Sequence, residues 1–262
     1  MSPRILGERD ATGAIAAVTL SNPDKLNAVT ASMWRDLTQH MRQLDGDEAL
    51  RCIVIRGEGA VFAAGGDIEE FLSVRNTYEQ VQVYHGEWVA EALRSIVACR
   101  HPCVAMIQGP CVGGGLAIAG QCDLRIAGVS AQFGAPIMKL GFSMAPTELA
   151  GLLALAGPAT TLEMLLEGRL LSAPEAYAKG LLTRVVDDDQ VEQEAYATAQ
   201  RIAAGAALVA RRHKRLVRRM SNDLSPLSAD EVRESYDYLD SEDYREGLAA
   251  FLDKRRPDFR GC

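Results

Sequence analysis

The segment HPCVAMIQGPCVGGGLAIAGQCDLRIAG, residues 101–128, contains the pattern that decides the fold class. Residues 102–109 form a short apolar run that is typical of a buried strand, and residues 109–120 predict a turn that enters a helix. The LRIAG and AQFGAP runs that follow predict two further short strands. Strands that alternate with helices in this way indicate an α/β architecture.

The same alternation extends toward the N-terminus. Residues 13–20 form a β-rich apolar run, and residues 51–57 form a second apolar strand that ends at a glycine. Between them, Thr30 can cap a helix with an apolar face at helical spacing, made of Met33, Leu37, Met41 and Leu44. A glycine loop at 61–71 and a helix over 77–99 complete the predicted N-terminal part of the chain.

Beyond residue 145 the sequence predicts mainly helices. Ser172 and Glu175 fit a capping box that starts one of them, and residues 181–186 predict one more strand. We therefore expect two parts, a core at 1–190 and a helical region at 191–262.

Composition and charge limit the classes of function. Hydrophobic residues make up 48% of the 262 positions, which is enough for a sizeable core. Lys and Arg number 28 against 35 Asp and Glu, and the net charge of −7 disfavours binding to a nucleic-acid backbone. The basic run at 210–220 then predicts a solvated or carboxylate-paired helix face, so we expect no nucleic-acid partner.

No sign of membrane insertion or secretion is expected either. No apolar run reaches the roughly 18 residues of a membrane span, and the N-terminus lacks the apolar part of a signal peptide. We expect a cytoplasmic protein with reduced, buried thiols at Cys52, Cys99, Cys103, Cys111, Cys122 and Cys262. Cys99 and Cys103 have no second ligand pair at zinc-site spacing, so we expect no metal site.

Two glycine loops, each after an apolar strand, are the features that carry chemistry. They are AAGGDI at 63–68 and GGGLA at 113–117. Each could be only a tight strand-to-helix turn. Two such loops that meet, however, would aim unpaired backbone N–H groups at one oxygen and form an oxyanion hole. A dinucleotide motif starting at Gly113 fails because Ile118 stands where its last glycine belongs, and no G-K-[ST] phosphate loop or G-x-S-x-G elbow is present.

Around these loops the chain resembles the crotonase superfamily, also called the enoyl-CoA hydratase/isomerase family. The resemblance runs in order through SNPDKLNAVT (21–30), VFAAGGDIEEF (61–71), the opening segment (101–128), AQFGAPIMKLG (131–141), LSAPEAYAKGLLTRVV (171–186) and YREGLAAFLDKRRPDF (244–259). It implies a spiral of ββα units followed by a helical C-terminal region that forms a homotrimer or a dimer of trimers. It also implies an acyl-CoA thioester substrate, with no cofactor beyond that coenzyme A moiety.

The resemblance assigns roles to individual residues. The N–H groups of Gly66 and Gly114 would bind the thioester oxygen. Residues along the coenzyme A moiety would be Lys25, Leu26 and Ala28, with Ala64, Asp67 and Ile68 lining its pantetheine and adenine end. Phe251 and Lys254 of the C-terminal helix would approach the nucleotide part, from the same or a neighbouring subunit.

Two positions depart from the family pattern. The hydratases of this family place one glutamate two residues after the glycine triplet and another directly after the proline of F-G-x-P. Here these positions hold Ala117 and Ile137. Because neither side chain can transfer a proton, hydration by the usual two-glutamate route is not expected.

Glu148 is the nearest spare carboxylate. Glu148 could be an acid/base group that has moved to a new position in the chain. Alternatively, it could have only a structural role, as a carboxylate in the first turn of a helix that starts at Pro146. Weaker candidates for an acid/base role are His85, Glu87 and Asp67. For Asp67 we expect instead that the carboxylate stabilises the glycine loop. Ser143 could act as a nucleophile only with a base beside it, and no feature of the sequence supplies one. Phe142 and Met144 would form an apolar acyl pocket.

Three functions therefore stay open. The first is an acyl-CoA enzyme with isomerase or lyase chemistry, such as a double-bond shift, decarboxylation of a malonyl-type thioester or thioester hydrolysis. The second is a catalytically silent acyl-CoA binder that retains the fold. The third, a serine peptidase on a related fold, is disfavoured because no Ser/His/Asp set can be placed.

Overall fold

The structure is a computed structural model that describes residues 2–261, and in that range the strands form two sheets. The larger sheet has six strands in the order β1 (Arg4–Arg9), β2 (Ile15–Ser21), β3 (Cys52–Gly57), β4 (Cys103–Ile107), β6 (Leu124–Gly128) and β9 (Arg184–Val186). Strand β1 is antiparallel to β2, and the other neighbours are parallel. The smaller sheet consists of β5 (Pro110–Val112), β7 (Gln132–Gly134) and β8 (Leu171–Ser172).

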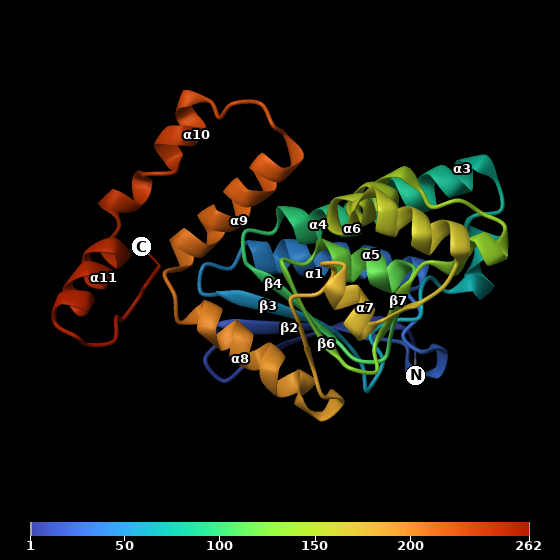
Figure 1. The fold of residues 1–262 in the computed structure, drawn as a ribbon, viewed down its shortest axis with the longest axis horizontal. Helices are drawn as coiled ribbons and strands as arrows, with labels where there is room; N and C mark the ends of the chain where they lie inside the picture. The colour runs from blue at the N-terminus through green and yellow to red at the C-terminus, as the bar shows by residue number, and fades with distance from the viewer. Residues whose placement is uncertain (1, 262) are drawn as a thin grey trace.

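Helices cover both faces of the larger sheet. The N-terminal part contributes α1 (Ala31–Asp45), α2 (Phe71–Val74), α3 (Tyr78–Val81), α4 (Ala90–Ala98) and α5 (Gly114–Gln121). The C-terminal part contributes α6 (Pro146–Glu167), α7 (Ala173–Ala178), α8 (Val191–Ala203), α9 (Ala207–Asn222), α10 (Ala229–Glu234) and α11 (Glu242–Leu252). Figure 1 shows α1, α4, α5 and α6 on one side of the larger sheet and α8 on the other. The predicted mixed α/β architecture is confirmed.

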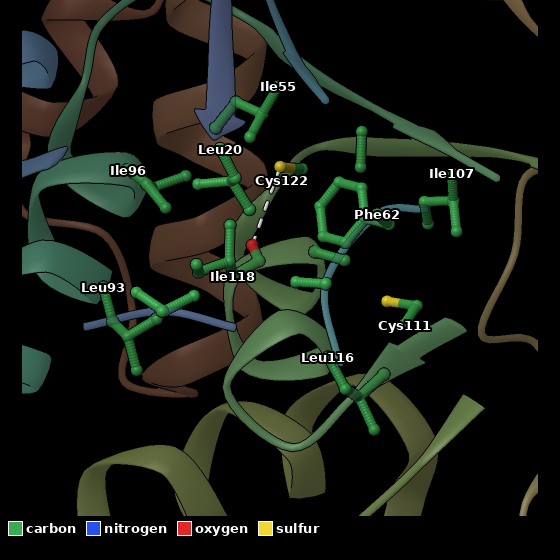
Figure 2. Close-up of a cluster of buried hydrophobic side chains, with 14 of the residues drawn as sticks. Leu20, Ile55, Phe62, Leu93, Ile96, Ile107, Cys111, Leu116, Ile118 and Cys122 are labelled. Atoms are coloured by element: carbon green, nitrogen blue, oxygen red, sulfur yellow. Dashed lines mark hydrogen bonds between the residues drawn. The ribbon is translucent and has the colours of Figure 1, made fainter. Parts of the chain in front are cut away.

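Parallel strands buried on both faces explain the continuous apolar runs of the sequence. In β3, Ile53 and Ile55 face the core under α1, α4 and α5, while Cys52 and Val54 face the core under α8. Side chains alternate between the two faces of a strand, so both faces must be apolar when both are covered. Figure 2 shows part of the first core, where side chains of β2, β3, α4 and α5 surround Phe62.

The buried cysteines belong to these cores. Cys52, Cys99, Cys103, Cys111 and Cys122 are free and buried, as predicted, whereas Cys262 lies outside the described residues. Burial raises the pKa of Cys122 to about 12, and its thiol donates to the carbonyl of Ile118 at 3.7 Å (Figure 2). These thiols are therefore packing groups. Among the described residues, no group of three or more His, Cys, Asp or Glu side chains could hold a metal ion.

Most local predictions agree with the structure. Thr30 caps α1 by accepting from the N–H of Met33 at 3.2 Å, and Ser172 with Glu175 forms the capping box of α7. The helix predicted over 77–99 is present, although its middle, Gln82–Val89, is a π-helix. The strand predicted at 181–186 is shorter, Arg184–Val186, because Leu181 and Leu182 are buried in the core instead of pairing.

Strand β1 was not predicted. Its sequence, RILGER, has only Ile5 buried, and the other described side chains are half-buried or exposed. The strand lies at the edge of the sheet and pairs antiparallel with β2, with Ile5 opposite Leu20. An edge strand with one buried side chain gives too weak an alternation for sequence reasoning to detect.

The basic run at 210–220 lies on α9, and its charges are paired with carboxylates as predicted. Lys214 and Arg218 both bind Asp123, at 2.9 and 2.8 Å, which attaches α9 to the core. The remaining four arginines of the run also form ion pairs, Arg211 with Glu48, Arg212 with Asp237, Arg215 with Glu234 and Arg219 with Glu231. These cations stabilise the packing of α9 and α10 within the chain.

Helix α6 corrects one expectation. By length and composition it could cross a membrane, with a mean hydropathy of 1.6 and only 17% of that window buried. The sequence prediction counted unbroken apolar runs, which Gly151, Gly157 and two threonines interrupt, whereas an averaged hydropathy tolerates such residues. The helix is broken at Gly157, whose φ of 69° is not helical, and Pro158 follows. The segment is therefore two helical pieces joined at a kink.

The C-terminal helices differ in how they relate to the core. Helix α8 packs on the larger sheet through Val191, Ala195 and Ala199, which are buried against β2, β3, β4 and β6. Helix α9 is attached to the core through Lys214 and Arg218, whereas α10 and α11 extend away from the layers, as Figure 1 shows. The helical region expected at 191–262 thus starts with a helix that completes the core.

Candidate active site

The two glycine loops lie against each other. The N–H of Ala63 donates to the carbonyl of Pro110 at 3.0 Å, and the N–H of Val112 donates back to the carbonyl of Ala63 at 3.0 Å. A Cβ on Gly115 would lie only 2.6 Å from the Ala63 oxygen, so glycine is required for this close approach. The structure therefore brings together two loops that are 50 residues apart in the sequence.

Gly66 and Gly114 lie close together, and both line the same cavity. Gly114 is the first residue of α5, and a Cβ there would lie 3.5 Å from the backbone nitrogen of Gly66. Among the described residues, neither N–H donates to any acceptor. Two unpaired donors in one wall, one of them at a helix N-terminus, suit a ligand oxygen that develops negative charge.

A cavity of about 150 Å³ opens beside these two donors. Its wall is mainly apolar and includes Ile68, Phe71, Val89, Val112, Ile137, Leu140, Phe142 and Met144. Glu148, His85 and Arg75 supply the ionisable side chains of this wall, together with the phenol of Tyr84. An apolar cavity with a few convergent polar groups is typical of a small-molecule site.

Glu148 and His85 are in contact in this wall. Nδ1 of His85 lies 3.0 Å from Oε2 of Glu148, with the oxygen off the direction of a ring N–H bond. Glu148 stands in the first turn of α6, and His85 comes from the π-helix, a local distortion that is frequent at functional sites. Both side chains are only 13–15% exposed. The two interpretations of Glu148 are therefore compatible, since a first-turn carboxylate also faces the cavity.

Tyr84 and Trp34 form a rigid wall behind the glycine donors. The indole Nε1 of Trp34 donates to the hydroxyl of Tyr84 at 3.2 Å, and burial raises the pKa of Tyr84 to about 12. A Cβ on Gly66 would lie 3.3 Å from that hydroxyl, and one on Gly114 would lie 3.0 Å from Cζ2 of Trp34. Side chains at either glycine would therefore intrude on this wall.

The first glycine loop is held by a charge cluster. Nζ of Lys25 lies 2.8 Å from both Asp67 and Glu69, and these carboxylates raise the pKa of Lys25. Asp67 also accepts the N–H of Glu69 at 3.2 Å, which caps the short helix Ile68–Glu70. Asp67 is thus placed as a loop stabiliser. The Lys25 ammonium is occupied by carboxylates within the chain.

Some of the other predicted coenzyme contacts lie at the cavity, and others lie far from it. Ala64 and Ile68 line the cavity, and Leu26 lies next to it, because its carbonyl accepts the N–H of Ala64 at 3.0 Å. Ala28 is buried nearby. Phe251 is 82% exposed on α11, and Lys254 follows the end of that helix. Within this chain, neither lines the cavity, and Figure 1 places α11 at the opposite end of the molecule from α3.

The remaining candidates are also placed. Ile137, Phe142, Ser143 and Met144 line the cavity, so the expected apolar pocket residues come together there. Ala117 packs against the core within α5, and Glu87 is exposed. Of the carboxylates considered from sequence, Glu148 alone belongs to the cavity wall in the described part of the chain.

Sequence reasoning missed several wall residues. Trp34, Phe71 and Tyr84 come from α1, α2 and the π-helix, and Arg75 directly follows α2. No motif marks these four residues. The signal available for Phe71 and Arg75 was their position a few residues after the first glycine loop. Nothing in a single sequence shows that this short segment folds over the loop.

The chain is similar over nearly its whole length to proteins of one family. The sequence model described as Enoyl-CoA hydratase/isomerase matches residues 10–262. A probable enoyl-CoA hydratase from Mycobacterium tuberculosis is 34% identical over 256 residues, covering 97% of each protein. One from Rhizobium meliloti is 32% identical over 249 residues, covering 95% of each.

Solved structures agree with this similarity. The crystal structure of an enoyl-CoA hydratase/carnithine racemase from Magnetospirillum magneticum has a TM-score of 0.95 and 46% identity, covering 98% of this chain and 96% of that one. A putative enoyl-CoA hydratase/isomerase family protein from Hyphomonas neptunium has a TM-score of 0.92 and 32% identity, covering 98% of both chains. The two sheets and their helices are thus arranged as in these proteins.

Proposed function

This chain belongs to the enoyl-CoA hydratase/isomerase family and has its crotonase fold, and on that premise we propose that it shifts the double bond of an enoyl-CoA thioester by proton transfer. The observation that carries the proposal is one cavity that holds two unpaired N–H donors and one carboxylate, those of Gly66, Gly114 and Glu148. A double-bond shift needs only one acid/base group, because the same carboxylate can remove the proton and return it.

The reaction follows from these three groups. The thioester oxygen accepts from the N–H groups of Gly66 and Gly114, which stabilise negative charge as it develops there. The Glu148 carboxylate removes a proton from the α-carbon of a 3-enoyl thioester, and the electrons of that C–H bond form the enolate. The protonated Glu148 then returns the proton to the γ-carbon. The carbonyl re-forms, and the double bond lies between the α- and β-carbons.

His85 would position the base in this scheme. Its Nδ1 lies 3.0 Å from Glu148 and both side chains are largely buried, so the carboxylate cannot swing freely into solvent. The apolar wall keeps water from the enolate, which strengthens the electrostatic effect of the two N–H groups. The coenzyme A moiety would then leave the cavity past Ala64 and Ile68 and along Lys25, Leu26, Ala28 and Asp67.

Hydration is the second candidate, favoured by one observation. Ala117 and Ile137 stand where the resemblance places the two glutamates, but His85 and Glu148 together provide two groups able to hold and deprotonate a water. The similar proteins from Mycobacterium tuberculosis and Rhizobium meliloti are named probable enoyl-CoA hydratases.

One assay separates these functions. Purified protein is incubated with a 3-enoyl-CoA and, separately, with crotonyl-CoA, and the products are resolved by chromatography against standards. We expect the 3-enoyl ester to become the 2-enoyl ester, with much slower hydration of crotonyl-CoA. Faster hydration would favour the second candidate. No turnover of either ester, together with measurable binding, would contradict both and indicate a catalytically silent binder.

We extend the proposal to self-association as a trimer or a dimer of trimers. Large apolar side chains are exposed on α6 and α11, with Leu162 54%, Leu166 65%, Phe251 82% and Leu252 78% exposed. Exposed apolar surface of this kind usually marks an interface. Light scattering on the purified protein should give the mass of three or six chains, and the mass of a single chain would contradict the proposal.

A further inference from the structure

Arg75 contributes a cation to the cavity that the proposed reaction does not use. It directly follows α2, and in the described part of the chain it is the only Lys or Arg in the cavity wall. The wall around it is otherwise apolar except for His85, Glu148, Ser143 and the phenol of Tyr84. A permanently charged guanidinium in an apolar cavity needs a physical reason.

Aromatic rings hold the guanidinium in place. Cζ of Arg75 lies 4.0 Å from the ring centroid of Phe71 and 4.3 Å from that of Phe142, with the Tyr84 centroid at 5.9 Å. The rings of Phe71 and Phe142 are themselves in edge contact at 6.0 Å between centroids. Stacking of this kind fixes the plane of a guanidinium and leaves its N–H donors free at the edge.

In the described part of the chain, no acceptor uses those donors. Among the described residues, the Arg75 guanidinium has no ion pair within 4.0 Å and no hydrogen bond, unlike the arginines of α9, which are paired with carboxylates. Glu148, the carboxylate in the same wall, contacts His85 instead. Burial lowers the pKa of Arg75, while Tyr84 and Glu148 oppose that shift. The group is therefore a partly desolvated cation with open donors.

Phe71 links this cation to the glycine donors. A Cβ on Gly66 would lie 3.3 Å from Cζ of Phe71, and the same ring lies 4.0 Å from Cζ of Arg75. The phenyl ring of Phe71 thus lies between Gly66 and the guanidinium. A short acyl chain bound at Gly66 and running along this ring would bring its far end to Arg75.

We propose that the cavity accepts a short acyl group with a carboxylate at its far end, and that Arg75 binds this carboxylate through two parallel N–H···O bonds. The inference rests on the proposed function, because it places the thioester at the glycine donors. It makes Arg75 the residue that determines specificity for dicarboxylic over neutral acyl thioesters. A planar, ring-stacked guanidinium suits a carboxylate better than a lysine would.

The test is a binding measurement that needs no turnover. Calorimetry compares glutaryl-CoA with 5-methylhexanoyl-CoA, a saturated ester of similar shape in which an isopropyl group replaces the carboxylate. We expect the wild-type protein to bind glutaryl-CoA at least about 10-fold more tightly, the range for charge-assisted hydrogen bonds. The variant Arg75→Gln should bring the ratio of the two dissociation constants close to one.

A matched control uses Arg35, which stacks on Trp88 with Cζ 4.9 Å from the ring centroid but does not line the cavity. Arg35→Gln should keep the wild-type ratio, and thermal unfolding checks that both variants are folded. Equal wild-type affinities for the two esters would overturn the proposal. An unchanged ratio in Arg75→Gln would also overturn it, and weaker binding of both esters would then indicate a coenzyme phosphate contact or a structural role.

Failure of this specificity proposal can be distinguished from failure of the proposed double-bond shift. If the wild-type ratio is high and depends on Arg75 but neither a neutral nor a dicarboxylic 3-enoyl ester turns over, the specificity stands and the reaction is wrong. If a 3-enoyl ester turns over and the ratio is one, the reaction stands and the specificity is wrong.

Discussion

Replacing Gly114 with proline should lower kcat/KM for the double-bond shift by about 10²–10³-fold, the usual loss when one oxyanion donor is removed. Proline has no N–H, and Gly114 is the first residue of α5, where proline is otherwise tolerated in a helix. The measurement is steady-state turnover of a 3-enoyl-CoA, together with the affinity for a saturated ester.

Two companion variants make this result interpretable. Gly114→Ala keeps the N–H but places a methyl 3.5 Å from the nitrogen of Gly66 and 3.0 Å from Cζ2 of Trp34, so it should also reduce turnover by narrowing the hole. Gly120→Ala, in the same helix, meets only Cδ2 of Leu155 at 3.6 Å and should leave turnover near wild type. Wild-type activity in a folded Gly114→Pro protein would show that this N–H is not an oxyanion donor.

Replacing Glu148 with glutamine should lower kcat by about 10²–10⁴-fold, which is the contribution of a positioned acid/base group. Glutamine has nearly the same shape and cannot take up the α-proton, while the cavity and the contact with His85 are largely preserved. The affinity for a saturated acyl-CoA should change little, because the two N–H donors remain. The measurement is again turnover of a 3-enoyl-CoA.

Glu87→Gln is the matched control for this prediction. Glu87 lies two residues from His85 on the same π-helix, but its side chain is exposed and does not line the cavity. It should retain wild-type turnover. If Glu148→Gln keeps most of the activity, or if Glu87→Gln loses as much, Glu148 is not the base.

The sequence predicted those parts of the fold and site that depend on local patterns. The capped helix at Thr30, the buried strands and the paired charges of α9 follow from residue spacing, charge and burial. The glycine loops could be found because each follows an apolar strand and opens a helix, whose first N–H groups have no intrahelical partner. The whole-chain resemblance then implied that the loops meet.

The parts that could not be predicted depend on contacts between distant segments. The edge strand β1 has one buried side chain and so no detectable alternation. Arg75 and Phe71 belong to a short irregular segment, and their approach to Gly66 depends on how that segment folds over the loop. Likewise, the contact between His85 and Glu148 joins residues 63 positions apart, and no local pattern predicts such a pair.

The central claim is that Glu148 moves a proton at the α-carbon of a thioester held by Gly66 and Gly114. Transfer of an α-deuterium tests this most directly. A 3-enoyl-CoA that carries two deuterium atoms on its α-carbon is incubated with the protein in H₂O, and the 2-enoyl product is analysed by mass spectrometry and NMR. The account predicts that the wild-type protein and Glu87→Gln move one of these deuterium atoms to the γ-carbon, and that Glu148→Gln and Gly114→Pro form almost no 2-enoyl product. Wild-type product without deuterium at the γ-carbon, or conversion at the wild-type rate by Glu148→Gln, would contradict it.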